Sequence, residues 1–443
     1  MRLVIVRQDY RPEGAVEHDL ERALEALLER NVAISLYTRS WPQTRLQLIE
    51  PMICDPFHAG KLWRDWGFAR AACRIVRRAR PSLVEAHEPM LCCDIFRAGE
   101  GVHAVWIEER LKRASTTERL AVLLSPRTWY QIAIEKRLYS SPWLRAVICN
   151  SRMVRDEIRG RFGLPESKLP VVYNPVDSDL FHPGLRAHRA KILERHGIDA
   201  GATVYLAVAS DFIRCGVGTA IAAIAELAPP SHLIVVGHDH DIHRYREIAR
   251  ASGVAARVTL AGPQENLRPY YGAADVFVLP SLYDPSPRTV QEALACGLAT
   301  VASTKSGGAE LVRDSDAGLV CLPGDVPMLA ACMRTLQDPT TRARCSANAR
   351  RAALPLSPSA ITLQLVLLYR DLLAVMTPAA TDVTTAARET TWPTGGIRTS
   401  SENAGAARTA APPELDTPVA ASPSTVQSTT TSGESAVGRP RIT

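Results

Sequence analysis

Two acidic residues in the second half of the chain, Asp284 and Glu292, are candidates for ligand binding or catalysis. Asp284 lies in a polar loop after the apolar run 276–279, and Glu292 lies in the helix predicted after that loop. The loop is therefore expected at the carboxyl end of a buried parallel strand, where open α/β sheets bind ligands. A carboxylate there can accept charge-assisted hydrogen bonds from both hydroxyls of a ribose, and such bonds are stronger than neutral ones.

Arg214 and Glu100 also follow predicted strands. The guanidinium of Arg214, after the run 204–209, can bind a diphosphate in a bidentate manner and offset the charge of a leaving group. Glu100 lies between two glycines, where a carboxylate could act as a base toward an acceptor hydroxyl or stabilise a cationic sugar. His103 could orient Glu100 or bind the acceptor. The alternative for Glu100 is an acidic turn without a function.

Gly14 and Asp19 lie between the apolar run 3–6 and a helical pattern of leucines. A strand, a glycine turn and a helix amino terminus make a site where backbone N–H groups and the helix dipole favour an anion. We expect Gly14 to contact the anionic part of one substrate and Asp19 to contact a second substrate; the alternative is a turn that binds nothing.

Two series of short apolar runs alternate with helical patterns, which predicts an α/β protein with two doubly wound domains facing a cleft. We predict a first domain over residues 1–178, a second over 179–358 and a crossover helix over 359–376. Residues 377–443 are rich in Thr, Ala, Ser and Pro, so we predict a disordered tail. The runs are 3–6, 33–37, 83–87, 95–96 and 144–149, then 204–209, 233–237, 258–260, 276–279, 300–303 and 318–320.

Two basic segments of the first half are amphipathic. In residues 61–80, an apolar face of Leu62, Trp66, Ala69, Cys73 and Val76 is predicted beside arginines, and residues 108–130 mix arginines with leucines and Trp129. Such segments can lie at an anionic membrane surface. The alternative is that each is a helix that packs on the core and exposes a basic face.

The composition is that of a globular protein: 443 residues, 46% hydrophobic and 22% charged, with a net charge of +6. No apolar run reaches the roughly 18 residues of a membrane span, and the first residues do not match a signal peptide. The ten cysteines are scattered without a CxxC pair, so we expect a reduced, cytoplasmic chain without a metal or redox site. We also expect residues 237–243, despite their histidines and aspartates, to form a loop. No continuous basic motif predicts nucleic-acid binding.

Several motifs taken together resemble the retaining glycosyltransferases of the family four type, which have two Rossmann-like domains in the GT-B arrangement. Within that family the chain is similar to the bacterial lipopolysaccharide core glucosyltransferase I group. The motifs are the opening strand with Gly14, Tyr37-Thr38-Arg39-Ser40-Trp41, Arg97-Ala98-Gly99-Glu100-Gly101-Val102-His103, Ser210-Asp211-Phe212-Ile213-Arg214, and the stretch from Asp284 to Glu292 with Gly307-Gly308 after it.

The resemblance implies roles for these residues. Glu292 would bind the ribose, Asp284 the transferred sugar and Arg214 the diphosphate, with Glu100, Asp284 and Arg214 forming the catalytic set. Further donor contacts would come from Asp211, Ser286, Arg288 and, as a platform for the base, Gln264.

The chain departs from the family pattern at three positions. Asp284 replaces the usual glutamate and is one methylene shorter. Pro287 removes a backbone N–H where glycine is common. Cys215 stands where the family has a lysine, so that Arg214 alone or a neighbour such as Arg288 or Lys305 would have to supply the positive charge.

The resemblance implies an enzyme that uses UDP-glucose as co-substrate without a cofactor or metal, the arginine and a helix dipole replacing the cation. The acceptor would be a lipopolysaccharide core or another cell-envelope glycan, reached at the inner face of the cytoplasmic membrane. Two alternatives stay open. A degenerate sugar-binding or scaffold protein would release no nucleoside diphosphate, and a nucleotide-sugar epimerase would convert its substrate without an acceptor.

Overall fold

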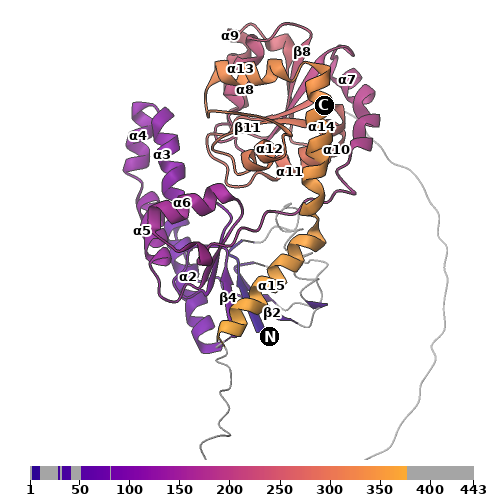
Figure 1. The fold of residues 1–443 in the computed structure, drawn as a ribbon. Coiled ribbons are helices and arrows are strands. Elements are labelled where there is room, and N and C mark those ends of the chain that lie inside the picture. The colour runs from indigo at the N-terminus through magenta and orange to yellow at the C-terminus, as the bar shows by residue number, and fades with distance from the viewer. Residues whose placement is uncertain (1, 10–27, 30–31, 41–50, 80, 377–443) are drawn as a thin grey trace, which may run out of the picture. The chain divides into compact units, whose positions relative to one another are not determined.

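The computed structural model describes residues 2–9, 28–29, 32–40, 51–79 and 81–376, which all belong to one compact unit, Met1–Ala379 (Figure 1). Gly14, Asp19 and the predicted tail at 377–443 lie outside the described residues, so the predictions made for them stay predictions.

The first sheet has six parallel strands in the order β3-β2-β1-β4-β5-β6. The short strand β3 was not predicted. The chain runs outward from β1 to β2 and β3 and then returns to β4 on the other side of β1, so β1 and β4 form the switch point of the sheet. The strands are β1 (Arg2–Val6), β2 (Ala33–Thr38), β3 (Pro51–Ile53), β4 (Leu83–Ala86), β5 (Ile95–Ala98) and β6 (Ala146–Cys149).

The second sheet repeats this pattern with the order β12-β11-β10-β7-β8-β9, again wholly parallel. Its switch point lies between β7 and β10. The two sheets confirm the predicted class of two doubly wound α/β domains. The strands are β7 (Thr203–Ala209), β8 (Ser231–Gly237), β9 (Val258–Gly262), β10 (Val276–Leu279), β11 (Ala299–Ser303) and β12 (Gly318–Cys321).

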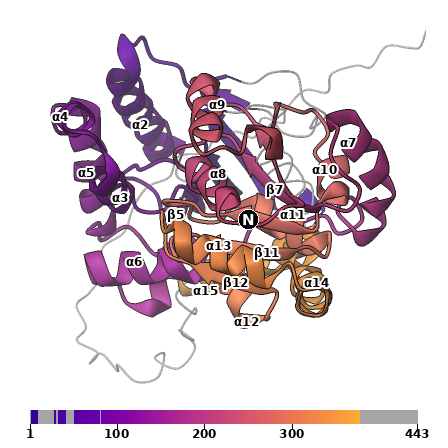
Figure 2. The same cartoon turned by 90° about the horizontal axis from the view of Figure 1, so that it is seen from above.

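Helices connect the strands, as parallel pairing requires. In the second domain α8 packs against α9 and α13, while α11 packs against α14 (Figures 1 and 2). The helices of the first domain are α2 (Gly60–Ala79), α3 (His103–Arg113), α4 (Thr116–Leu123), α5 (Pro126–Tyr139), α6 (Arg152–Phe162) and η1 (Glu166–Lys168). Those that follow are η2 (Pro183–His188), α7 (Arg189–His196), α8 (Val217–Ala225), α9 (Ile242–Ala251), η3 (Ala255–Arg257), α10 (Arg268–Ala273), α11 (Arg288–Ala295), α12 (Ala309–Asp314), α13 (Val326–Thr335), α14 (Pro339–Ala353), η4 (Leu354–Leu356) and α15 (Pro358–Met376).

The basic segment 108–130 is not one helix but parts of three. Ser115 caps α4 in a capping box with Glu118, and the side chain of Ser125 accepts the N–H of Thr128 at the start of α5. Each cap satisfies donors that a continuous helix would use internally, so these serines divide the segment. Of α4 only Val122 is buried.

The predicted apolar face of α2 is wrong in part. Gly67, Phe68, Ala72 and Val76 are buried, whereas Trp66 is 46% exposed with the Arg70 guanidinium over its ring. The prediction placed the large aromatic residue Trp66 on the buried face. A helix with apolar residues on more than one face has no unique buried stripe, so its sequence does not show which face packs on the core.

The expectation of a fully reduced chain is also wrong, because Cys73 and Cys92 form a disulfide. Their Cα atoms lie 5.6 Å apart, within the usual range for a disulfide, although the residues are separated by 19 positions in the sequence. The bond links α2 to the loop between β4 and β5, a proximity that spacing alone does not reveal. The other eight cysteines are free.

Helix α15 returns from the second domain to the first sheet. Figure 1 shows α15 beside this sheet. The hydroxyl of Tyr369, on α15, donates to the buried carboxylate of Glu85 on β4, which also lies 2.8 Å from Nε of Arg97. Burial opposes ionisation of Glu85, but Arg97 and the hydrogen bonds from His87 and Tyr369 together hold its pKa below the ordinary value. Among the described residues no single helix is long and apolar enough to cross a membrane; α14 and α15 meet that test only as a pair bent by 44°.

Candidate active site

The switch point of the second sheet brings two predicted catalytic residues together. Arg214 lies in the loop after β7 and Asp284 in the loop after β10, and these strands are neighbours. Because parallel strands place their carboxyl ends at one edge, both loops lie where doubly wound sheets bind ligands. Gly216 adopts a φ of +73° at the end of the first loop, and a Cβ there would lie 2.1 Å from the carbonyl oxygen of Pro280. This glycine therefore allows the two loops to touch.

Arg214 is held in place by several contacts. Its backbone N–H donates to Oδ1 of Asp211 at 2.9 Å, its Nε donates to the carbonyl of Tyr283 at 3.0 Å, and its Nη1 lies 3.4 Å from Oε2 of Glu100. The guanidinium also lies 5.7 Å from the centre of the Trp106 ring. Asp211 thus shapes the loop after β7. Arg214 joins the loop that contains Tyr283 to Glu100 of the first domain.

The three charged groups at this point influence each other. Burial raises the pKa of the Asp284 carboxyl to about 6, with Arg214 opposing the rise and the negative charge of Glu100 adding to it. Glu100 itself is 90% exposed, so its carboxylate is accessible to a ligand. With both acids ionised, the two carboxylates around one guanidinium carry a net negative charge.

Tyr283, directly before Asp284, is fully buried in the core of the first domain. Its hydroxyl accepts the N–H of Val102 at 2.9 Å and donates to Oε2 of Glu157, also at 2.9 Å. Gly101 makes this possible, because a Cβ at that position would lie 2.3 Å from the Tyr283 hydroxyl. The Asp284 loop of the second domain is therefore anchored beside the Glu100 turn of the first.

Further contacts join the same loop to the start of α6. The hydroxyl of Ser151, which also caps α6, donates to the carbonyl of Pro285 at 2.7 Å. Asn174 donates to the carbonyl of Ser286 at 3.1 Å. Glu310 of α12 accepts the N–H groups of Arg152 and Met153 at 2.8 and 3.0 Å. A carboxylate at a helix amino terminus is favoured by the helix dipole, so these contacts fasten α6 to the second domain.

Glu292 lies on α11, the helix predicted after the Asp284 loop, which begins after Pro287 and is followed by Gly297 at a φ of +71°. Its Oε2 accepts a hydrogen bond of 2.7 Å from the Tyr271 hydroxyl. Burial raises the pKa of Glu292, opposed by Tyr271 and by the positive charge of Arg288. One carboxylate oxygen of Glu292 is thus fixed by Tyr271.

The structure shows the surroundings of Cys215 and of the two residues that were suggested to replace the missing positive charge. Cys215 is buried, and burial raises the pKa of its thiol to about 12, so it carries no charge near neutral pH. Lys305, proposed as a substitute cation, lies 3.1 Å from Oε1 of Glu157 and is engaged there. Arg288, the other candidate, lines the cavity described next together with Arg214.

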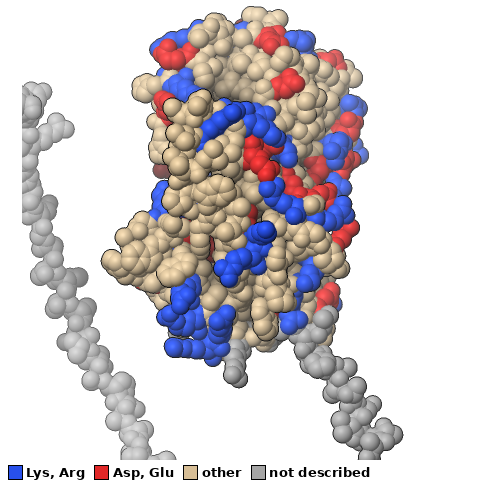
Figure 3. All heavy atoms as spheres, turned by 90° about the vertical axis from the view of Figure 1, so that its left-hand side faces the viewer, with Lys and Arg blue, Asp and Glu red and all other residues tan. Residues whose placement is uncertain are grey.

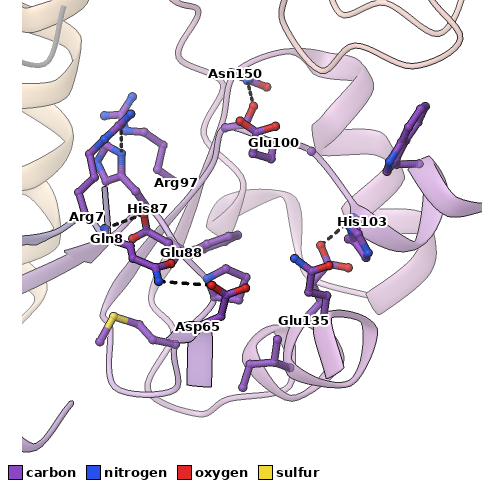
Figure 4. Close-up of a pocket in the computed structure, with 18 of the residues that line it drawn as sticks. Arg7, Gln8, Asp65, His87, Glu88, Arg97, Glu100, His103, Glu135 and Asn150 are labelled. Atoms are coloured by element: carbon purple, nitrogen blue, oxygen red, sulfur yellow. Dashed lines mark hydrogen bonds between the residues drawn. The ribbon is translucent and has the colours of Figure 1, made fainter. Parts of the chain in front are cut away.

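A cavity of about 600 Å³ lies beside this cluster and extends along the carboxyl edge of the first sheet. Four predicted site residues line it: Glu100, His103, Arg214 and Arg288. The close-up in Figure 4 shows further polar side chains on its walls, which the sequence did not single out: Gln8, Asp65, Glu88, Glu135 and Asn150.

His103 and Glu135 form one wall of that cavity. The N–H of His103, at the start of α3, donates to Oε1 of Glu135 on α5 at 2.7 Å (Figure 4). Burial lowers the pKa of His103 to about 4, with Arg127 contributing, and raises that of Glu135 to about 7. The imidazole is therefore neutral near pH 7.

The structure does not bring every predicted donor residue to this cavity. Asp211, Asp284, Ser286 and Glu292 do not line it: the first three lie in the loops after β7 and β10, and Glu292 lies on α11. Gln264 follows the edge strand β9 and donates its amide to the carbonyl of Ala261. In the run 237–243, Asp241 caps α9 and Asp239 accepts the N–H of Phe212. No group of three metal-binding side chains is found in the described part of the chain.

Sequence reasoning missed Tyr283, Glu88 and Glu135. Glu88 directly follows a predicted strand, a position that could have drawn attention because ligands bind at the carboxyl ends of parallel strands. Tyr283 lies next to the predicted acid, but nothing local indicates that it enters the core of the other domain. Glu135, in the middle of a helix, carries no signal in the sequence.

Two family models match consecutive parts of the chain. The model for Glycosyltransferase Family 4 matches residues 16–180, and the model for group 1 glycosyl transferases matches residues 188–352. A probable transglycosylase of Burkholderia thailandensis is 30% identical over 233 residues, which are 52% of this chain and 60% of that protein. The matched part thus spans less than two thirds of that relative.

Two solved structures share the fold. WaaG, a glycosyltransferase involved in lipopolysaccharide biosynthesis, superposes with a TM-score of 0.69 at 19% identity over 83% of this chain and 99% of its own. Anabaena HepE in complex with UDP and glucose superposes with a TM-score of 0.61 at 20% identity over 84% of this chain and 100% of its own. These identities support the fold alone. With both domain models matched in order on two doubly wound sheets, the chain belongs to the family 4 type of glycosyltransferases with the GT-B fold.

Proposed function

We propose that this protein is a retaining glycosyltransferase that moves glucose from UDP-glucose to a cell-envelope glycan such as a lipopolysaccharide core. The observation that carries the proposal is that Arg214, Asp284 and Glu100 lie together, in loops that follow strands of the two sheets. A cation beside two carboxylates suits a reaction in which negative charge leaves and positive charge develops on the sugar.

In the proposed reaction the bond between the sugar C1 and the diphosphate oxygen breaks, and the electron pair stays on the diphosphate. Arg214, with Arg288 nearby, offsets that charge, and Glu292 holds the ribose. The acceptor oxygen attacks C1 from the face that the diphosphate leaves, and its proton passes to the departing diphosphate or to Glu100. No side chain serves as a covalent nucleophile in this scheme.

UDP and glucose are carried over from HepE, and a lipopolysaccharide acceptor from WaaG, as parts of the proposal. The test is to incubate the purified chain with UDP-glucose, GDP-mannose and ADP-glucose, with and without lipopolysaccharide core oligosaccharide, and to measure released nucleoside diphosphate. We expect UDP release that depends on UDP-glucose and rises with acceptor. Absence of release from all three donors would contradict the proposal.

We also propose that the first domain docks on the inner face of the cytoplasmic membrane. Helix α4 and the start of α5 expose Leu120, Leu123, Leu124 and Trp129 by 50% or more. Arg119 of α4 is exposed among them. Figure 3, which views the side where α4 and α5 lie in Figure 1, shows Lys and Arg beside surface made by residues without charge. Apolar side chains flanked by cations suit an anionic interface. Co-sedimentation with phosphatidylglycerol vesicles should weaken in Leu124→Ser.

A second candidate is a sugar-binding protein without transferase activity, favoured by the buried, uncharged Cys215 where relatives carry lysine. The two are separated by UDP release in the absence of acceptor, which an inactive binder lacks. Restoring the cation with Cys215→Lys should then raise turnover of an active but weak enzyme and leave an inactive binder without turnover.

A further inference from the structure

Glu157, in the middle of α6, holds two residues of the second domain. Its Oε2 accepts a hydrogen bond of 2.9 Å from the hydroxyl of Tyr283, and its Oε1 accepts one of 3.1 Å from Nζ of Lys305. The Glu157 side chain is 13% exposed and Tyr283 is fully buried. Both carboxylate oxygens of Glu157 are thus engaged within the protein, and the residue does not line the cavity beside Arg214.

The two partners of Glu157 are residues that hold Asp284 in place. Tyr283 is its neighbour in the chain, and the backbone carbonyl of Lys305 accepts the N–H of Asp284 at 2.9 Å. Together with Glu157, these three residues close a ring of covalent and hydrogen bonds. The first domain contributes only Glu157 to this ring, so that residue decides how the ring sits on the first domain.

Tyr283 also contacts the surroundings of the other two charged groups of the candidate active site. Its carbonyl accepts Nε of Arg214 at 3.0 Å. Its hydroxyl accepts the N–H of Val102 at 2.9 Å, two residues after Glu100 in the chain. The position of Tyr283 therefore affects Arg214 and Glu100 as well as its own neighbour in the loop.

The direction of the hydrogen bond between Tyr283 and Glu157 follows from the groups involved. The backbone N–H of Val102 only donates, so the Tyr283 oxygen is the acceptor in that contact. The single hydrogen of the hydroxyl then goes to Glu157, since an ionised carboxylate only accepts. Burial and the negative charge of Glu157 raise the pKa of Tyr283 further above its ordinary value, so the hydroxyl keeps this hydrogen.

A carboxylate is needed at position 157 because both partners are donors. The amide of a glutamine has one accepting oxygen and one donating nitrogen. The charge of Lys305 would attract the oxygen of such an amide and leave its N–H group facing the hydroxyl of Tyr283. A buried donor without an acceptor is unfavourable. Only a carboxylate therefore satisfies Tyr283 and Lys305 at the same time.

We infer that Glu157 is a positioning residue of the transfer reaction, which holds the loop of Asp284 against the turn of Glu100. Both acids are thereby kept beside the guanidinium of Arg214. This role rests on the proposed function, because it concerns the groups to which that function assigns the transfer. Glu157 acts through its two partners and not by contact with the reacting atoms. A displacement of about 1 Å at the reacting groups lowers turnover by as much as about 10²-fold.

Turnover is the first test. Glu157→Ala should lower the rate of UDP release from UDP-glucose by about 10²-fold. Glu157→Gln should lower it by about tenfold, because the amide still satisfies one partner. Each rate is divided by the number of UDP sites per chain found by calorimetry, so that unfolded molecules do not count. The control is Glu166→Gln, an acid of η1 that pairs with Arg155 at 3.1 Å and Arg159 at 3.2 Å, and it should keep the wild-type rate.

A second substitution separates positioning from a contribution to folding. In the double variant Glu157→Gln with Lys305→Met, no ammonium group attracts the glutamine oxygen, which then accepts from Tyr283. The double variant should turn over about fivefold faster than Glu157→Gln alone, the effect of one regained hydrogen bond. If the two side chains only stabilised the fold, their losses would add, and the double variant would be slower than either single variant.

Hydrogen exchange without substrate measures the position of the two loops independently of transfer. Two amides report it: that of Val102, bound to the hydroxyl of Tyr283, and that of Asp284, bound to a backbone carbonyl. In Glu157→Ala, peptides that contain these amides should exchange about tenfold faster than in the wild type, since local opening becomes easier. The control variant should exchange as the wild type does.

The outcomes distinguish the positioning role from the proposed function. If the wild type releases no UDP from any donor but Glu157→Ala speeds the exchange of both amides, the proposed function fails and Glu157 still positions the two loops. If the wild type is active and Glu157→Ala keeps its rate, the inference is overturned. Unchanged exchange in Glu157→Ala also overturns it, because a slower rate would then have another cause. Should the alanine variant not fold, Glu157→Gln, which keeps nearly the native shape, carries the same comparisons.

Discussion

The two sheets have the same topology but present different groups at their switch points. At β7 and β10 a guanidinium, Arg214, meets the Asp284 carboxyl, whereas at β1 and β4 a carboxylate, Glu88, meets a backbone N–H. Loops at equivalent positions of the two sheets thus carry different charged groups, and the net charge of +6 of the chain predicts neither arrangement.

The largest expected effect comes from removing the cation of the second switch point. Arg214→Ala should lower turnover of UDP-glucose by about 10²–10³-fold, the loss seen when one stabilising donor is removed. Initial rates of UDP release measure it. Arg250→Ala, which removes an exposed arginine paired with Glu247 on α9, should leave the rate unchanged. Equal rates of UDP release for the two variants would mean that Arg214 does not contribute to turnover.

A smaller effect on stability is expected for Glu135, a buried carboxyl group that lines the cavity beside the first sheet. The pKa of Glu135, raised to about 7 by burial, exceeds the ordinary 4.5, so its ionisation opposes folding. Its contribution to stability is full below pH 4.5 and is lost as the pH rises through 7. Relative to wild type, Glu135→Gln should therefore gain stability between pH 5 and pH 8, by at most about 3 kcal/mol.

Urea unfolding at the two pH values measures this gain. His103, with its pKa lowered to about 4, stays neutral throughout, and the positive charge of Arg161 does not change. Glu247→Gln, on the exposed face of α9, should show no such dependence. A gain of the same size in that control would assign the effect to the net charge of the protein.

The smallest effect concerns nucleotide affinity in the second region. Glu292→Ala should weaken UDP binding by about tenfold, because a charge-assisted hydrogen bond contributes roughly 1.5–3 kcal/mol. Tyr271→Phe, which frees the oxygen that Tyr271 holds, should weaken it less. Calorimetry with UDP gives both values. Glu135→Ala should not change the affinity for UDP. A change in that variant would mean that nucleotide binding is not confined to the second region.

The sequence predicted the strands well because buried parallel strands are continuous apolar runs, as in residues 204–209 and 276–279. The loop of Asp284 and the helix of Glu292 were found for the same reason. Contacts between distant parts were not predictable. Tyr283 enters the core of the other domain, and Tyr369 reaches Glu85 from 284 positions away, with no local pattern to indicate either.

The first domain shows this limit most clearly. Glu135 accepts the N–H of His103 because α5 packs against α3. In the sequence it is one charged residue among many on a helix. The disulfide of Cys73 and Cys92 and the engagement of Lys305 by Glu157 are likewise consequences of packing.

The return of α15 to the first sheet has a consequence for biosynthesis. Glu85 is made early, but one of its buried partners, Tyr369, lies on the last described helix. A nascent chain therefore carries an incompletely satisfied carboxylate in its first domain until the whole of the second sheet has been translated. Domains otherwise tend to fold in order from the amino terminus. Here a contact of the first domain forms last, so premature termination before Tyr369 should leave Glu85 without that partner.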